Sequence, residues 1–296
     1  MARLLGFIAN RPDLGSRAVA LESKAFTVRV SEPPAGAAPS PSPRESNPTL
    51  EGSVSWGVGF YQGGEILLKR RPFDERRALG FPDLVKDIRA DVLIGHIRTA
   101  TVGALRTENT HPFRYRQWLF AQTGTVPHFD RLRGRVLEQL PQFLARDVRG
   151  ETDAELVFYL FLSFLHDMNK LDRADVAAGT VRDALRSTLS LVERLCAEET
   201  KDRVALNMVV GCADYIVGTR LSNPMGFHMM AGRAALERIF GGESFSRTKI
   251  PHLMSARIAL LAADLDDDRL PAGWTALEDR TTVTLSHSDD PHVERL

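Results

Sequence analysis

Apolar residues follow two different periods along the chain. Short runs that are continuously apolar, or that alternate apolar with polar residues, predict strands in the first and last thirds. In the middle third, Leu and Val recur at helical spacing. We expect strands at Leu4–Ala9, Ser55–Tyr61, Glu65–Arg70, Asp91–His96, Gln117–Gln122, Ala205–Cys212, Tyr215–Arg220, Phe227–Met230, Arg257–Ala263 and Thr281–Ser286, and helices at Arg131–Arg146, Asp153–Met168 and Ala174–Glu199. Strands, then helices, then strands favour an α+β fold built in layers.

Turn and loop signals divide these elements. Gln62-Gly63-Gly64 separates two strand patterns and predicts a β-hairpin. Ser31–Pro48 carries six of the sixteen prolines, which blocks helices and central strands and predicts a surface loop. This loop lies too close to the first strand to separate two domains. We therefore expect residues 1–296 to form one domain.

Charge and hydropathy exclude several classes of partner. The 38 Lys and Arg residues balance 38 Asp and Glu residues, so the formal net charge is +0. Nucleic acids and anionic membranes are bound by concentrated basic surfaces, and we expect neither as a partner. The longest apolar stretch, Leu156–Leu165, has half of the roughly 20 residues that a membrane-spanning helix needs. We expect no signal peptide at the N-terminus.

Common chemical motifs are missing from the sequence. There is no glycine-rich phosphate loop, dinucleotide fingerprint or Gly-x-Ser-x-Gly elbow, and the eight histidines are scattered. The acidic residues Asp264, Asp266, Asp267 and Asp268 lack the glycine and distal Glu of a calcium loop, and we expect them in a solvated turn. Two cysteines exclude a disulfide scaffold or multi-cysteine zinc site and favour the cytoplasm. We expect no metal and no cofactor.

A set of spaced segments carries more information than any single motif. In order, the chain contains Met1-Ala2-Arg3-Leu4-Leu5-Gly6, Trp56-Gly57-Val58-Gly59-Phe60-Tyr61, His96-Ile97-Arg98-Thr99-Ala100-Thr101-Val102-Gly103, Asn109-Thr110-His111-Pro112-Phe113, Trp118-Leu119-Phe120-Ala121-Gln122-Thr123-Gly124 and Thr152-Asp153-Ala154-Glu155. Together they resemble the class II glutamine amidotransferases, a branch of the N-terminal-nucleophile hydrolases. The closest likeness is to the short, stand-alone members. The resemblance implies a four-layer αββα sandwich.

Two positions depart from the pattern of that family. Its members begin Met-Cys and use the cysteine thiol to attack the side-chain amide of glutamine, whereas this chain has Ala2 at that position. A methyl group can neither attack nor transfer a proton. The family motif "H-N-G", whose Asn and Gly resemble an oxyanion hole, is here Gln122-Thr123-Gly124. Gly124 keeps a backbone donor, while the Thr123 hydroxyl is shorter than an Asn amide.

The resemblance also implies a pocket for an amino acid. Arg98 matches the arginine that binds the α-carboxylate of glutamine, Asp153 matches the aspartate that binds its ammonium group, and Thr101 lies in the adjoining loop. Each residue has a simpler interpretation as well. Arg98 could form a structural salt bridge, Thr101 could cap a turn, and Asp153 lies inside the sequence Thr152-x-x-Glu155, which is typical of a helix capping box.

These departures favour a catalytically degenerate protein, or pseudoenzyme. It would keep a pocket for glutamine or a γ-glutamyl small molecule and act by binding or regulating a partner enzyme. The alternative is an active glutaminase or γ-glutamyl amide hydrolase in which Ala2 has replaced the nucleophilic cysteine. A third hypothesis, new chemistry that uses Thr123 or His111, has less support, because the family chemistry does not need His111. The oligomeric state does not follow from the sequence.

Overall fold

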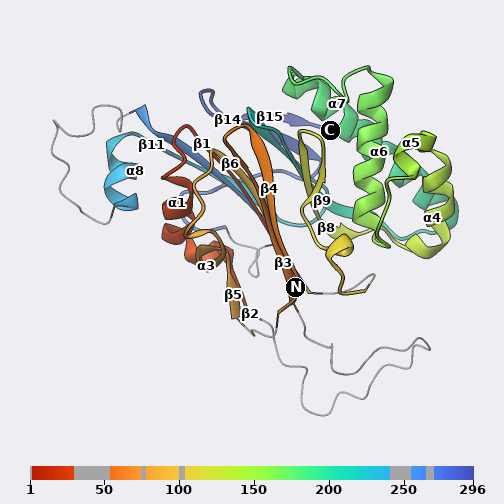
Figure 1. Ribbon diagram of the computed structural model, residues 1–296, viewed down its shortest axis with the longest axis horizontal. Coiled ribbons are helices and arrows are strands. Elements are labelled where there is room, and N and C mark those ends of the chain that lie inside the picture. Colours follow the sequence, from red (N-terminus) through yellow and green to blue (C-terminus); the bar gives the residue numbers. More distant parts are fainter. Residues whose placement is uncertain (1, 30–53, 75–77, 100–103, 241–254, 265–269) are drawn as a thin grey trace, which may run out of the picture.

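Two large antiparallel sheets lie face to face, and helices cover the outer face of each sheet (Figure 1). The computed structural model describes residues 2–29, 54–74, 78–99, 104–240, 255–264 and 270–296. The two facing sheets and the two outer layers of helices confirm the predicted αββα sandwich. The Ser31–Pro48 segment lies outside the described residues.

The first sheet holds the N-terminal strand at its centre. Its strands occur in the order β13-β11-β12-β1-β6-β3-β4. Their bounds are β1 Ala2–Ala9, β3 Val54–Gln62, β4 Glu65–Asp74, β6 Val92–Thr99, β11 Met225–Ala231, β12 Arg257–Ala263 and β13 Thr275–Ala276. Strand β1 is antiparallel to both of its neighbours, β12 and β6. The N-terminal residues are thus fixed in the middle of the molecule.

The second sheet contains the β7–β8 pair and four of the C-terminal strands. Its order is β15-β14-β10-β9-β8-β7. The bounds are β7 Phe113–Tyr115, β8 Trp118–Thr125, β9 Ala205–Gly211, β10 Tyr215–Arg220, β14 Thr281–Ser286 and β15 His292–Arg295. A separate two-stranded sheet pairs β2 Thr27–Arg29 with β5 Ala78–Gly80.

The helices form two outer layers (Figure 1). The first comprises α1 Gly15–Leu21, α2 Ser23–Phe26, α3 Phe81–Val85 and α8 Gly232–Ile239, and the second comprises α4 Phe129–Glu138, α5 Gln142–Ala145, α6 Asp153–Asp167 and α7 Ala178–Glu199. A 3₁₀ turn, η2, spans Thr107–Asn109. The single helix expected at Arg131–Arg146 is wrong. Pro141 separates α4 from α5, because proline cannot donate the backbone hydrogen bond of a helix interior.

Strand β1 is buried on both faces, which explains its unbroken apolar sequence. Leu5 and Phe7 pack in the apolar layer that includes α1, α3 and α8. Leu4 and Ile8 pack between the two sheets, against residues of β8, β9 and β10. Side chains alternate between the faces of a strand, so even-numbered positions of β1 project toward the second sheet. Ala2 is on this inner side.

The N-terminus of α6 is held by side chains on both sides of its first turn. The Thr152 hydroxyl accepts a hydrogen bond from the Glu155 backbone N–H at 3.3 Å, as a capping box requires. The Glu155 carboxylate instead accepts from the N–H groups of Arg149 at 2.9 Å and Gly150 at 2.7 Å. The capping prediction is therefore confirmed for Thr152, while Glu155 stabilises the preceding turn.

Two buried histidines lie side by side, His96 on β6 and His111 just before β7. The rings of His96 and His111 are 4.3 Å apart between centroids. His96 Nε2 and both ring nitrogens of His111 have no hydrogen-bond partner among the described residues. Burial, together with the positive charge of Arg98, lowers the pKa of His96 to about 3, and burial lowers the pKa of His111 in the same direction. Both rings are therefore neutral at physiological pH.

The chain approaches β3 closely at Gly57. A Cβ atom at this position would lie 2.2 Å from the backbone oxygen of His111 and 2.9 Å from Cγ of Arg70. Only glycine lets the segment before β7 lie directly against the first sheet.

We expect acid to destabilise the protein through the buried histidines. An unfolded histidine takes up a proton near pH 6.5, whereas folded His96 resists protonation until about pH 3, so the free energy of unfolding falls as the pH drops below 6.5. At pH 5 the expected loss from His96 is about 2 kcal/mol. Urea unfolding at pH 7 and pH 5 measures it. His96→Leu should flatten this dependence, while His292→Gln, at an exposed position, should not. An unchanged pH dependence in His96→Leu would contradict the assignment.

Gly57→Ala should lower the free energy of unfolding by about 1–3 kcal/mol, because the added methyl group overpacks against a backbone carbonyl. Gly134→Ala provides the matched control. Gly134 lies inside α4 with nothing within 4 Å of its Cβ position, so alanine should stabilise the helix by about 1 kcal/mol. Thermal and urea unfolding compare the two variants. Equal effects would show that the contact with His111 is unimportant.

Candidate functional site

A row of three side chains crosses the inner face of the first sheet at the start of β1. Ala2 lies directly opposite Arg98 on β6, and Arg98 lies directly opposite Ser55 on β3. Cβ atoms of directly opposed residues in antiparallel strands are about 4.5–5.5 Å apart. Ala2 is half-buried, and Ser55 and Arg98 are buried. The structure therefore places the predicted nucleophile position beside the predicted carboxylate-binding arginine.

Arg98 is a buried cation, with 7% of its surface exposed. Its Nη1 donates a hydrogen bond to the backbone oxygen of Asn109 at 3.2 Å. Burial lowers the pKa of Arg98, whereas the nearby carboxyl of Asp153 raises it. An arginine stays charged in proteins despite such shifts. The side chain therefore places a permanent positive charge beside the start of β1, on the neighbouring strand β6.

Asp153 reaches the site from the helical layer. It is the first residue of α6, and its Oδ2 accepts a hydrogen bond from the backbone N–H of Val126 at 2.7 Å. Its Oδ1 accepts from the N–H of Ala154 at 2.9 Å. Burial raises the pKa of Asp153, and these two hydrogen bonds and the charge of Arg98 lower it. The carboxyl thus ties α6 to the end of β8 while it remains within the electrostatic influence of Arg98.

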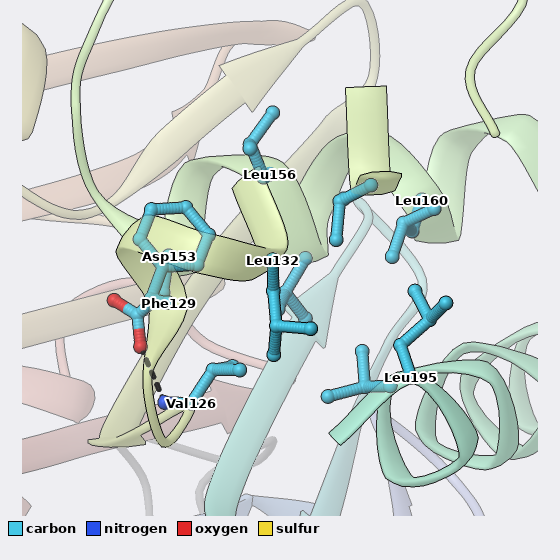
Figure 2. Close-up of a pocket in the computed structure, with 10 residues that line it drawn as sticks. Val126, Phe129, Leu132, Asp153, Leu156, Leu160 and Leu195 are labelled. Carbon is cyan, nitrogen blue, oxygen red and sulfur yellow. Dashed lines mark hydrogen bonds between the residues drawn. The ribbon is translucent and has the colours of Figure 1, made fainter. Parts of the chain in front are cut away.

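Asp153 also closes one end of a narrow apolar cavity (Figure 2). The cavity has a volume of about 10 Å³, which is roughly the space of one water molecule. Apart from Asp153, its walls are apolar side chains of α4, α6 and α7 and the loop before them, among them Val126, Phe129, Leu156 and Leu195. It is a packing gap in the helical layer, too small for an amino acid.

Thr123 and Gly124 approach the site from the second sheet. The neighbouring residues Leu119 and Ala121 of β8 pack between the sheets, so Thr123 projects to the same side. Gly124 has a φ of +90°, and a Cβ atom there would lie 1.9 Å from the backbone oxygen of Ala205. Only glycine fits at this position. Gln122 is buried, and neither of its amide atoms has a partner in the described part of the chain.

Asp264 is a site residue that sequence reasoning missed. The expectation of a solvated turn is wrong for this residue, which is half-buried at the end of β12. Burial raises the pKa of its carboxyl, while the hydroxyl of Thr123 and the charge of Arg3 lower it. The only signal in the sequence was its place directly after an apolar strand. Asp266, Asp267 and Asp268 lie outside the described residues.

The remaining predicted positions are less informative. Thr101 lies outside the described residues. His111 is buried and contacts His96 and Phe113.

Within the described ranges, no group of three or more His, Cys, Asp or Glu side chains could hold a metal ion. None of the described helices is both long and apolar enough to span a bilayer.

Comparisons with known proteins identify the family. The profile of the class II glutamine amidotransferases matches residues 44–196. The "Probable glutamine amidotransferase DUG3" of Saccharomyces cerevisiae is 28% identical over 123 residues, which cover 40% of this chain and 34% of that protein. The gamma-glutamyl-hercynylcysteine sulfoxide hydrolase of Mycobacterium tuberculosis is 31% identical over 99 residues, which cover 33% of this chain and 42% of that protein. These alignments span less than half of each relative.

A solved structure shows the same fold over almost the whole chain. The class II glutamine aminotransferase domain protein of Silicibacter pomeroyi superposes with a TM-score of 0.56 at 14% identity, over 99% of this chain and 98% of that one. The fold is accordingly the N-terminal-nucleophile hydrolase sandwich, and the assignment of residues 1–296 to one domain stays a prediction. Because the profile covers more than half of the 296 residues, the chain belongs to the class II glutamine amidotransferase family.

Proposed function

We propose that this protein is a catalytically degenerate class II glutamine amidotransferase that binds glutamine or a γ-glutamyl small molecule and regulates a partner enzyme. The observation that carries the proposal is the pair formed by Ala2 and Arg98. A methyl group occupies the position of the family nucleophile, directly opposite the arginine that matches the carboxylate-binding residue of the family. The chemical step is lost at this position, while the binding group is retained.

The charges around this position support a ligand that carries both signs. Arg98 offers a cation and Asp153 an anion, and each shifts the pKa of the other. An α-amino acid presents a carboxylate and an ammonium group on one carbon, so it can meet both charges at once. A guanidinium grips a carboxylate through two parallel hydrogen bonds. Burial of both groups strengthens such contacts, because little water competes for them.

The cellular setting belongs to the same proposal. Cys196 and Cys212 are buried and free in the structure. Burial raises the pKa of both thiols, which keeps them protonated and unreactive. We place the protein in the reducing cytoplasm, where free thiols persist.

A second candidate function is an active γ-glutamyl amide hydrolase whose cysteine has been replaced by Ala2. The Mycobacterium tuberculosis relative, which is named as a hydrolase, favours this candidate. The change at Thr123 argues against it. A replaced nucleophile alone would leave the Asn of the oxyanion hole in place, whereas here two separate catalytic elements differ from the family pattern.

Arg98→Ala should weaken the binding of L-glutamine about 10–150-fold, because a charge-assisted contact worth about 1.5–3 kcal/mol is lost. Arg98→Lys should give an intermediate affinity, since an ammonium group keeps the charge without the planar fork. Isothermal titration calorimetry measures both. Arg131→Ala, at an exposed position on α4, is the control and should bind like wild type. Wild-type protein that binds no glutamine, or Arg98→Ala that binds equally well, would overturn the proposed pocket.

The unmodified sequence should release no ammonia from glutamine above the background rate, because Ala2 cannot form the covalent intermediate. Ala2→Cys alone should recover little activity, since the loss of one oxyanion-hole donor costs about 10²–10³-fold in rate. Ala2→Cys combined with Thr123→Asn should recover more, provided that mass spectrometry confirms removal of Met1. A coupled ammonia assay compares the three proteins. Full activity in Ala2→Cys alone would instead favour the second candidate function.

A further inference from the structure

Asp264 is an acidic residue next to the N-terminal strand that neither the family resemblance nor the proposed function uses. It directly follows β12, whose last residue, Ala263, lies opposite Leu4 on β1. Its backbone adopts the left-handed conformation, with a φ of +57°. Such a conformation interrupts the side-chain alternation of the strand, and aspartate adopts it more readily than most other residues.

The carboxyl of Asp264 turns toward the second sheet. It lies close enough to the hydroxyl of Thr123 and to the side chain of Asn223 for both to lower its pKa. Thr123 is 2% exposed, and its Oγ1 forms no well-aligned hydrogen bond within the described part of the chain. The hydroxyl and the carboxyl are thus neighbours on the inner face of the sandwich, and Thr123 retains hydrogen-bonding capacity for a further group.

A buried asparagine fixes the turn on which Asp264 rests. Asn207 lies opposite Thr123 on β9, and its Nδ2 donates to the backbone oxygen of Asn223 at 3.1 Å. Its Oδ1 accepts from the N–H of Leu221 at 3.1 Å. The backbone N–H of Asp264 donates to the oxygen of Pro224 at 3.0 Å. The turn at 221–224 is therefore braced from both sides, and Asp264 is held in one position.

The order of the strands sets the distance between Asp264 and Arg98. Arg98 is on β6 and Asp264 directly follows β12, the two strands that flank β1, so their backbones are about 10 Å apart across two strand spacings. An extended glutamine separates its α-carboxylate from its amide nitrogen by about 6 Å, as follows from bond lengths near 1.5 Å. Contacts of about 3 Å at each end bring the span between the contacting side-chain groups to about 12 Å, which is comparable to this backbone separation. A ligand anchored at Arg98 is therefore long enough to extend past Ala2 toward Asp264.

We propose that Asp264 and Thr123 form the amide-binding end of the ligand pocket and make it selective for γ-carboxamides over γ-carboxylates. This inference rests on the proposed function, because it needs the α-carboxylate of the ligand at Arg98. The Thr123 hydroxyl donates to the Asp264 carboxylate, and this carboxylate accepts a second hydrogen bond from the amide N–H of the ligand. Glutamate would place a second carboxylate against Asp264 and be repelled.

The wild-type protein tests this selectivity without any substitution. L-glutamine methylated at its side-chain amide nitrogen (N-methylglutamine) and the γ-methyl ester of L-glutamate have nearly the same shape. The ester carries oxygen in place of the amide N–H. We expect glutamine and N-methylglutamine to bind about 10–150-fold more tightly than the ester, as a hydrogen bond to a charged acceptor predicts. Glutamate should bind at least as weakly as the ester. Calorimetry measures all four affinities.

Asp264→Asn should bring the four affinities closer together, because an amide side chain can accept from glutamine and donate to glutamate or the ester. Asp87→Asn, at an exposed position after α3, is the matched control and should keep the preference of wild type. If wild type binds none of the four compounds, the proposed function fails. If wild type binds glutamine but no more tightly than the ester, or folded Asp264→Asn keeps the preference, only the role of Asp264 fails.

Discussion

Burial of the Arg98 guanidinium is the interaction on which the arrangement of the site depends. Moving a charge out of water costs several kcal/mol unless the surrounding groups replace the lost hydration. Here they include the backbone oxygen of Asn109 and the carboxyl of Asp153. These groups belong to the η2 segment and to α6, while Arg98 itself belongs to the central sheet. One cation therefore couples the first sheet to the loop and to the helical layer beyond the second sheet.

The region around Ala2 is polar. Arg98 lies directly opposite Ala2, Ser55 lies directly opposite Arg98, and Thr123 lies near Asp264 at the end of β12. A site with no remaining role could exchange such groups for apolar ones at little cost, since unsatisfied buried polar groups destabilise a fold. Under the proposed function, these polar groups would hold a ligand that the methyl group of Ala2 cannot convert.

The parts of the fold that the sequence predicts are those with long, regular patterns. All the expected strands exist, because each buries a continuous or alternating apolar face. Helices α1, α3 and α8 escaped prediction, since they are short and are held by the sheet they cover. Arg98 and Asp153 were predicted only because the spaced segments resemble a family. Asp264 was assigned to solvent, because its burial depends on Thr123 and on the 221–224 turn, both distant in sequence.

Strand β4 lies at an edge of the first sheet in the described part of the chain, with one row of backbone groups open to further pairing. Open edges invite two molecules to join their sheets, which is a common beginning of aggregation. The sequence Lys69-Arg70-Arg71-Pro72 runs along this edge. Adjacent positive charges repel a second copy, and the proline offers no N–H to an incoming strand. Both features oppose the pairing of a further strand with this edge.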